Sequence, residues 1–156
     1  MKTLLRSFIA CLLLGGQFQV ALAQSKDVEA IKAVVAKETS SFMNVDYKNW
    51  SDTWLKAPYS YWSYSDSTST SYLEGWEGID KNFQSYFRTS KPSRATITNE
   101  WQQIRVYGNG AYVRFVQKVK DDIDRDETSQ MRVLEKTKDG QWKVICVGAI
   151  AKYPKE

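Results

Sequence analysis

The fold is decided by the last third of the chain, residues 95–153, which reads ATITNEWQQIRVYGNGAYVRFVQKVKDDIDRDETSQMRVLEKTKDGQWKVICVGAIAKY. Runs rich in Val, Ile, Tyr and Trp are separated by Gly108-Asn109-Gly110 and by Asp139-Gly140. Asn-Gly and Asp-Gly supply the positive φ angles that two-residue hairpins need. The stretch therefore predicts four antiparallel strands, over roughly residues 94–107, 111–121, 127–138 and 141–151.

The first of these strands changes phase along its length. Ile97 and Trp101 fall on one face by alternation, whereas Ile104 and Val106 fall on the other. An extra residue in one strand of a pair produces such a change and bends the sheet. We therefore expect a β-bulge between Asn99 and Gln103.

The first half of the chain carries helical signals. Residues 25–44 have apolar side chains at helical spacing, and the stripe contains Val28, Ile31, Val35 and Phe42. Asp46 is placed to cap a second, shorter helix, on which Tyr47, Trp50 and Trp54 share a face, and Lys56-Ala57-Pro58 ends it.

A strand and a third helix complete this half. Residues 59–66 alternate aromatic and small polar side chains and predict a strand, which returns at residues 72–74 after a Ser/Thr-rich loop. Residues 78–89 predict a third helix, which Lys91-Pro92 ends. Three helices followed by an antiparallel sheet that curls indicate the α+β class.

The N-terminus has the pattern of a signal peptide. Lys2 and Arg6 precede an apolar run over residues 8–14, and Ala21-Leu22-Ala23 is a small-x-small cleavage signal. We expect cleavage after Ala23, a single domain over residues 24–156, and an exported protein that is periplasmic or secreted. Lipidation at Cys11 is the alternative. No later run is long enough to span a membrane, so no membrane association is expected after cleavage.

Charge and composition exclude several classes of function. Without Lys2 and Arg6 the formal charge falls from +4 to +2, and no Lys/Arg cluster points to nucleic acid. The chain has no histidine, which removes Ser-His-Asp and Cys-His catalysis and the usual zinc sites. Cys146 has no partner once Cys11 is removed, and a buried hydrophobe is favoured there over a reactive thiol.

Neither a metal nor a cofactor is expected. The charged stretch over residues 121–126 lacks the glycine and the distal glutamate of an EF-hand, so a solvated turn is favoured over a calcium site.

Three segments resemble the NTF2-like superfamily, and in particular its SnoaL-like and DUF4440-type branches. They are Phe42-Met43-Asn44-Val45-Asp46-Tyr47-Lys48-Asn49-Trp50, Glu74-Gly75-Trp76-Glu77-Gly78-Ile79-Asp80-Lys81-Asn82-Phe83 and Lys138-Asp139-Gly140-Gln141-Trp142-Lys143-Val144-Ile145. They look like the junction of the first two helices, the start of the third helix and the final hairpin. The resemblance spans almost all of residues 25–153 and implies a cone, in which three helices pack on a strongly curved mixed or antiparallel sheet.

The resemblance implies a fold and leaves the activity open, because members include isomerases, cyclases, dehydratases and binding or dimerising modules. Isomerase-like members carry an acid just after the second helix, where this chain has Lys56-Ala57-Pro58-Tyr59. Many relatives place a histidine near the end of the last strand, where this chain has Cys146 and Gly148.

Candidate ligand-binding residues are the aromatic side chains that would line such a cone, together with two mid-strand arginines. Core packing is the alternative for any one aromatic, and a solvent-facing position is the alternative for each arginine. The candidates are Tyr47, Trp50, Trp54, Tyr61, Trp62, Trp76, Trp101, Tyr112, Arg114 and Arg132.

The candidate catalytic carboxylates are Glu74 and Asp46. Glu74 stands beside Trp76, where desolvation would raise the pKa of a carboxyl group. Asp46 is most simply a helix cap. Glu100 is a further polar candidate.

Four functions remain open from the sequence. The first is an exported domain that binds a small apolar or ring-containing ligand in an aromatic-lined cavity. The second is an enzyme of the isomerase, cyclase or dehydratase type with a carboxylate acid or base. The third is an interaction module that forms a homodimer through its open sheet face, and the fourth is a carbohydrate-binding surface.

Overall fold

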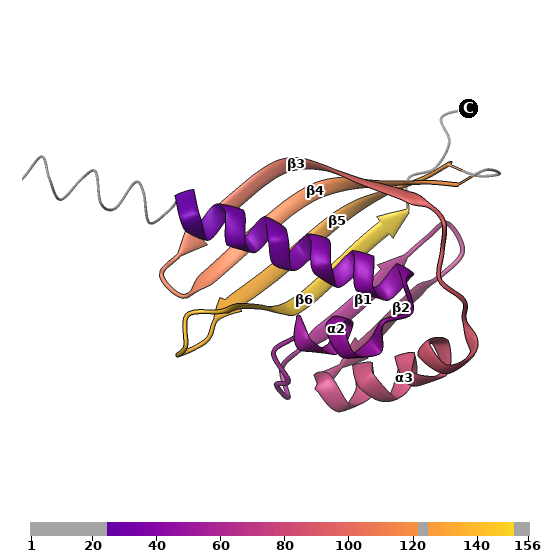
Figure 1. The fold of residues 1–156 in the computed structure, drawn as a ribbon, viewed down its shortest axis with the longest axis horizontal. Coiled ribbons are helices and arrows are strands. Elements are labelled where there is room, and N and C mark those ends of the chain that lie inside the picture. The colour runs from indigo at the N-terminus through magenta and orange to yellow at the C-terminus, as the bar shows by residue number, and fades with distance from the viewer. Residues whose placement is uncertain (1–24, 122–124, 152–156) are drawn as a thin grey trace, which may run out of the picture.

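The computed structural model describes residues 25–121 and 125–151. A first helix over residues 25–43 is followed by two further helices and a six-stranded sheet (Figure 1). The elements are α2 (Tyr47–Asp52), β1 (Tyr61–Ser65), β2 (Thr70–Glu74), α3 (Gly75–Thr89), β3 (Thr96–Tyr107), β4 (Gly110–Lys120), β5 (Arg125–Lys136) and β6 (Trp142–Ala151). The predicted signal segment, residues 1–23, and the centre of the charged turn, residues 122–124, lie outside the described residues.

The sheet has the strand order β2-β1-β6-β5-β4-β3. All neighbouring strands are antiparallel except β1 and β6, which are parallel. The first helix crosses the inner face of the curved sheet, and α2 and α3 cover the end formed by β1 and β2 (Figure 1). The α+β prediction of helices packed on a curved mixed sheet is therefore confirmed.

The second helix is shorter than the sequence predicts. It ends at Asp52, whereas the prediction carried it past Trp54 to Lys56. The backbone there pairs with β6 instead, because the N–H of Leu55 donates to the carbonyl of Val144 at 2.9 Å and the N–H of Val144 donates to the carbonyl of Thr53 at 2.8 Å. Trp54 thus lies in an isolated parallel bridge rather than on the helix.

The third helix begins three residues before the predicted start. Gly75 has a φ of +70°, and its N–H donates to the carbonyl of Ser60 at 2.7 Å. A Cβ at this position would lie 3.3 Å from the carbonyl oxygen of Pro58. Glycine therefore allows the chain to turn directly from β2 into α3.

The predicted bulge in β3 is confirmed. The register with β4 shifts between Trp101 and Gln103. This shift returns Ile104 and Val106 to the face that Trp101 occupies, and all three side chains pack against the core. A second irregularity, where Val133 pairs with Cys146 and Leu134 with Val144, was not predicted.

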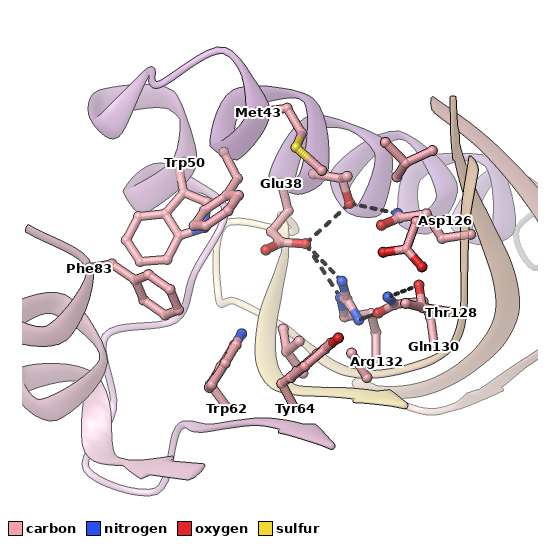
Figure 2. A pocket seen from close by; sticks show the side chains of 16 residues that line it. Glu38, Met43, Trp50, Trp62, Tyr64, Phe83, Asp126, Thr128, Gln130 and Arg132 are labelled. Atoms are coloured by element: carbon pink, nitrogen blue, oxygen red, sulfur yellow. Dashed lines mark hydrogen bonds and ion pairs between the residues drawn. The ribbon is translucent and has the colours of Figure 1, made fainter. Parts of the chain in front are cut away.

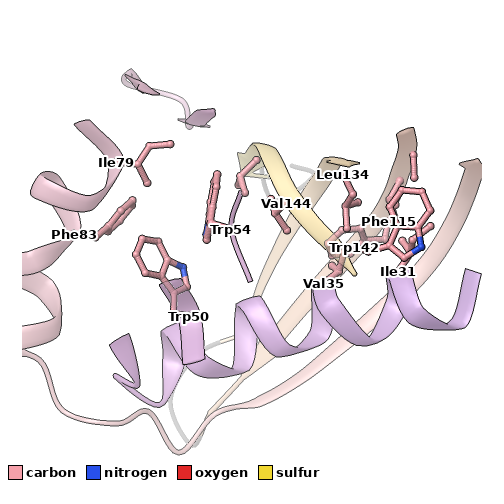
Figure 3. Close-up of a cluster of buried hydrophobic side chains, with 13 residues drawn as sticks. Ile31, Val35, Trp50, Trp54, Ile79, Phe83, Phe115, Leu134, Trp142 and Val144 are labelled. Carbon is pink, nitrogen blue, oxygen red and sulfur yellow. The ribbon is translucent and has the colours of Figure 1, made fainter. Parts of the chain in front are cut away.

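The apolar core lies between the first half of the first helix and the inner face of β4, β5 and β6, and it continues to α2 and α3 through Trp50, Trp54, Ile79 and Phe83 (Figure 3). Ile31 and Val35 of the helix and Leu134 of β5 are fully buried there. Asp27 ties the helix to the sheet, because its Oδ1 accepts from Lys136 Nζ at 2.7 Å and from Trp142 Nε1 at 3.0 Å. The first half of the first helix is therefore held on the sheet, and its second half is held by Phe42, whose ring stacks on Tyr86.

No helix within the described residues is both long enough and apolar enough to cross a membrane.

Candidate functional site

A cavity of about 230 Å³ lies between the second half of the first helix and the inner face of the sheet (Figure 2). Every layer of the fold contributes to its lining. The lining residues are Glu38, Thr39, Phe42, Met43, Trp50, Trp62, Tyr64, Phe83, Gln117, Val119, Asp126, Thr128, Gln130, Arg132, Val147 and Ala149.

One wall of the cavity is aromatic. Trp50 comes from α2, Trp62 from β1 and Phe83 from α3 (Figure 2). The ring of Phe83 lies 5.1 Å from that of Trp62 and 5.6 Å from that of Trp50, in edge-on arrangements. Such contacts stabilise aromatic pairs and hold the rings in one geometry, so this wall presents a fixed apolar surface.

The opposite wall carries a buried ion pair. Arg132 of β5 is 4% exposed and Glu38 of the first helix is 6% exposed. Arg132 Nη2 lies 3.1 Å from Glu38 Oε2, and Arg132 Nε donates to the same oxygen at 3.4 Å. Arg132 Nη1 donates to Gln130 Oε1 at 2.7 Å and to the carbonyl of Met131 at 3.0 Å. These partners offset the free-energy cost of removing the guanidinium from water, and they hold it in place.

Hydrogen bonds extend this wall along two strands. Gln130 Nε2 donates to Thr128 Oγ1 at 2.6 Å. Gln117 Nε2 of β4 donates to Thr39 Oγ1 at 3.2 Å and to Asn99 Oδ1 at 3.1 Å. The polar wall is therefore a connected network, which positions its members more firmly than isolated pairs would.

The sequence contains a signal for this network, although Glu38, Thr128 and Gln130 were not among the predicted site residues. Glu38 falls on the apolar stripe of the first helix, three residues after Val35 and four before Phe42. Thr128, Gln130 and Arg132 alternate along β5, so they share one face. A charged residue inside an apolar stripe and a polar run on an inward strand face together indicate a polar interior.

Three of the predicted ligand-binding residues meet at the cavity: Trp50, Trp62 and Arg132. Trp54 and Trp76 pack beside it, with ring centroids 6.0 Å and 5.7 Å from that of Trp50. Trp54 is 2% exposed, and its Nε1 is buried without a hydrogen-bond partner among the described residues.

The remaining predicted ligand-binding residues lie elsewhere. Trp101 packs on Phe115 in the core, with ring centroids 5.1 Å apart. Tyr47 is 39% exposed, and its hydroxyl donates to Asp80 Oδ1 at 2.6 Å, a bond that raises the pKa of the tyrosine. Tyr61, Tyr112 and Arg114 alternate with inward residues and so lie on the outer face of the sheet.

The predicted catalytic carboxylates do not line the cavity. Asp46 caps α2 by accepting from the N–H of Asn49 at 3.0 Å, and hydrogen bonds from the Asn49 side chain and backbone lower its pKa. Glu74 is exposed at the start of α3 and makes no capping hydrogen bond. Glu100 is also exposed and forms an ion pair with Lys118.

Cys146 is a free, partly buried thiol on β6, and burial raises its pKa. A raised pKa keeps the thiol protonated, which is the inert form. Within the described ranges, no three or more His, Cys, Asp or Glu side chains gather in a way that would hold a metal ion.

No protein-family model matches this sequence, and no curated protein matches it. Solved structures do match. An NTF2-like protein of unknown function from Shewanella oneidensis aligns with a TM-score of 0.63 at 12% identity, over 80% of this chain and 98% of that one. A second NTF2-like protein of unknown function, from Shewanella baltica, gives 0.62 at 18% identity, over 83% and 97%.

A ketosteroid isomerase-like protein from Erwinia carotovora aligns with a TM-score of 0.60 at 14% identity, over 81% of this chain and 96% of that one. At such identities the similarity lies in the course of the backbone and carries no activity with it. From its strand order, its helices and these matches, the chain has the NTF2-like α+β fold.

Proposed function

We propose that this domain binds a small ring-containing molecule in the cavity between the first helix and the sheet. The observation that carries the proposal is the contrast between the two walls: fixed aromatic rings face a buried and connected polar network. Ligand pockets typically combine an apolar lining with a few polar groups that set orientation.

The size of the cavity limits the ligand. An apolar cavity of roughly 150 Å³ in another protein holds benzene. A volume of about 230 Å³ therefore suits one ring with a short polar substituent. The ring would lie against Trp50, Trp62 and Phe83, and the substituent would face the network around Glu38 and Arg132.

Binding without turnover is favoured over acid–base catalysis. Asp46 caps a helix and Glu74 is exposed, so neither carboxylate faces a ligand in this cavity. Glu38 does face it, but one of its carboxylate oxygens is held by Arg132.

The experiment is a binding screen with single-ring compounds, followed by tryptophan fluorescence and calorimetry. Trp62→Leu removes one aromatic face, and Tyr72→Leu removes an exposed aromatic ring from β2, outside the cavity. We expect saturable binding of at least one compound to the native protein and to Tyr72→Leu, with affinity at least tenfold lower for Trp62→Leu. A screen without any hit, or equal affinity in all three proteins, would contradict the proposal.

Export and self-association belong to the same proposal. The signal-like pattern of residues 1–23 supports secretion of a SnoaL-like or DUF4440-type domain, and N-terminal sequencing of the mature protein would test for cleavage after Ala23. The helices cover one face of the sheet (Figure 1). Tyr72 and Ile150 are exposed and alternate with the inward Leu73 and Ala149, so they lie on the other face. This open face supports a homodimer, which sedimentation would detect.

A further inference from the structure

Glu38 has one carboxylate oxygen engaged and one facing the cavity. Oε2 accepts hydrogen bonds from Arg132 Nη2 at 3.1 Å, from Arg132 Nε at 3.4 Å and from Thr39 Oγ1 at 3.5 Å. Among the residues that the structure describes, none donates to Oε1. Figure 2 shows this second oxygen pointing away from Arg132, toward the side where Trp50 and Trp62 lie. A side chain that is 6% exposed thus offers an unused acceptor to the interior of the cavity.

The guanidinium of Arg132 is not available to a ligand in the same way. Its Nε and Nη2 donate to Glu38, and its Nη1 donates to Gln130 and to the backbone of Met131. Its charge is therefore compensated inside the wall. An anionic ligand would have to compete with Glu38 for the same donors and would meet the repulsion of that carboxylate.

The described side chains that line the cavity and carry a formal charge have a negative balance. They are the guanidinium of Arg132 and the carboxylates of Glu38 and Asp126. One positive and two negative charges leave one negative charge in excess. Glu38 and Arg132 are buried and Asp126 is exposed, so the excess negative charge lies at the rim of the cavity, where it favours a cation over an anion.

The aromatic wall favours the same kind of ligand. The faces of tryptophan rings carry partial negative charge and attract cations, with tryptophan the strongest of the aromatic side chains. Trp50 and Trp62 both line the cavity on the side toward which Glu38 Oε1 points (Figure 2). A cation placed there would interact with a carboxylate oxygen and with aromatic faces at once.

We propose that the ligand is a small amine, bound as its ammonium ion, with one ring or a short apolar chain. The ammonium group donates to Glu38 Oε1, and the apolar part packs against Trp50, Trp62 and Phe83. The assignment of this ligand class rests on the proposed function, because it requires that the cavity bind a small molecule.

The test compares three probes of similar size and different charge: 2-phenylethylamine, 2-phenylethanol and phenylacetate. Calorimetry at pH 7 and low salt would measure each affinity for the native protein. We expect the amine to bind at least tenfold more tightly than the alcohol, and phenylacetate to bind most weakly. If the alcohol or phenylacetate binds as tightly as the amine, the amine assignment is wrong and the proposed function stands. If none of the three binds, both the amine assignment and the proposed binding function fail for ligands of this size.

Two variants test which carboxylate produces the preference for the amine. Glu38→Gln keeps the shape of the side chain and removes its charge, so the advantage of the amine over the alcohol should fall at least tenfold. Asp126→Asn changes an exposed carboxylate at the rim and leaves the buried pair intact, so it should reduce the advantage by a smaller factor without affecting folding. Glu29→Gln, at an exposed position on the same helix, is the matched control and should leave the advantage of the amine over the alcohol unchanged. An unchanged preference in both Glu38→Gln and Asp126→Asn would overturn the proposal.

Discussion

The first helix and the strands β4 and β5 pack around an apolar core at one end and form the polar wall of the cavity at the other. Two or three residues further along the inward face of each element, apolar side chains give way to polar or charged ones. The corresponding pairs are Val35 and Glu38 on the helix, Phe115 and Gln117 on β4, and Leu134 and Arg132 on β5. The changes on β4 and β5 are staggered, because Arg132 pairs with Val113 and Gln130 pairs with Phe115, so polar and apolar side chains overlap at the boundary between the two ends.

The difference shows how one backbone separates stability from binding. The packed end excludes water and holds the helix on the sheet through apolar burial. The polar end buries groups whose desolvation is offset only by their mutual hydrogen bonds. The stability of the polar end should therefore depend on every buried polar group keeping its hydrogen-bond partners. The stability of the packed end should depend on how completely its side chains fill the interior volume.

Arg132→Met should have the largest effect on stability. It leaves Glu38 buried without its cation, and breaking a buried pair from one side costs about 3–5 kcal/mol. Urea unfolding followed by circular dichroism measures this loss. The double variant Glu38→Leu/Arg132→Met should regain most of it, since no buried charge remains. A loss below about 1 kcal/mol in the single variant would mean that the pair is far more hydrated than its 4% and 6% exposure indicates.

Two alanine-to-leucine substitutions compare the two ends directly. Ala111 is buried in the packed core, and Ala149 lines the cavity. Ala111→Leu should destabilise the domain by about 1–3 kcal/mol because it overpacks the core. Ala149→Leu should cost less than about 1 kcal/mol, since its extra atoms enter empty space, and should abolish binding of the single-ring probes. Equal destabilisation by the two substitutions would show that the cavity end is as tightly packed as the core.

Asp27→Asn should have the smallest effect, and a pH-dependent one. The hydrogen bond from Lys136 lowers the pKa of Asp27 below its ordinary value of 3.8. The ionised form is thus favoured in the folded state, so its stabilisation is complete above that value and is lost as the pH falls through the folded-state pKa. We expect a loss of about 1 kcal/mol at pH 7 that shrinks below about pH 4. Thermal unfolding of both proteins at pH 7 and pH 3 gives the comparison, and a difference independent of pH would exclude this role for the carboxylate.

Local patterns were enough to predict most of the elements. Alternation bounded by Asn-Gly and Asp-Gly turns placed the four long strands within a few residues, and the phase change at Trp101 placed the bulge of β3. The end of α2 was missed, because the backbone at Thr53 and Leu55 pairs with Val144, about ninety residues further along the chain. No local signal reports such a partner.

The order of residues in this chain determined its fold class, since side-chain periodicity and turn chemistry act over a few residues and can be read directly from the sequence. The site was decided by the tertiary structure. Glu38 and Arg132 are 94 positions apart, and their pairing depends on which faces of a helix and a strand meet when the sheet curves. Trp50 and Trp62 were plausible binding residues from their type, but only the packing of α2, β1 and α3 set them opposite a buried carboxylate. Long-range contacts of this kind follow from the whole fold, because these side chains become buried and face one another only when distant segments of the chain pack together.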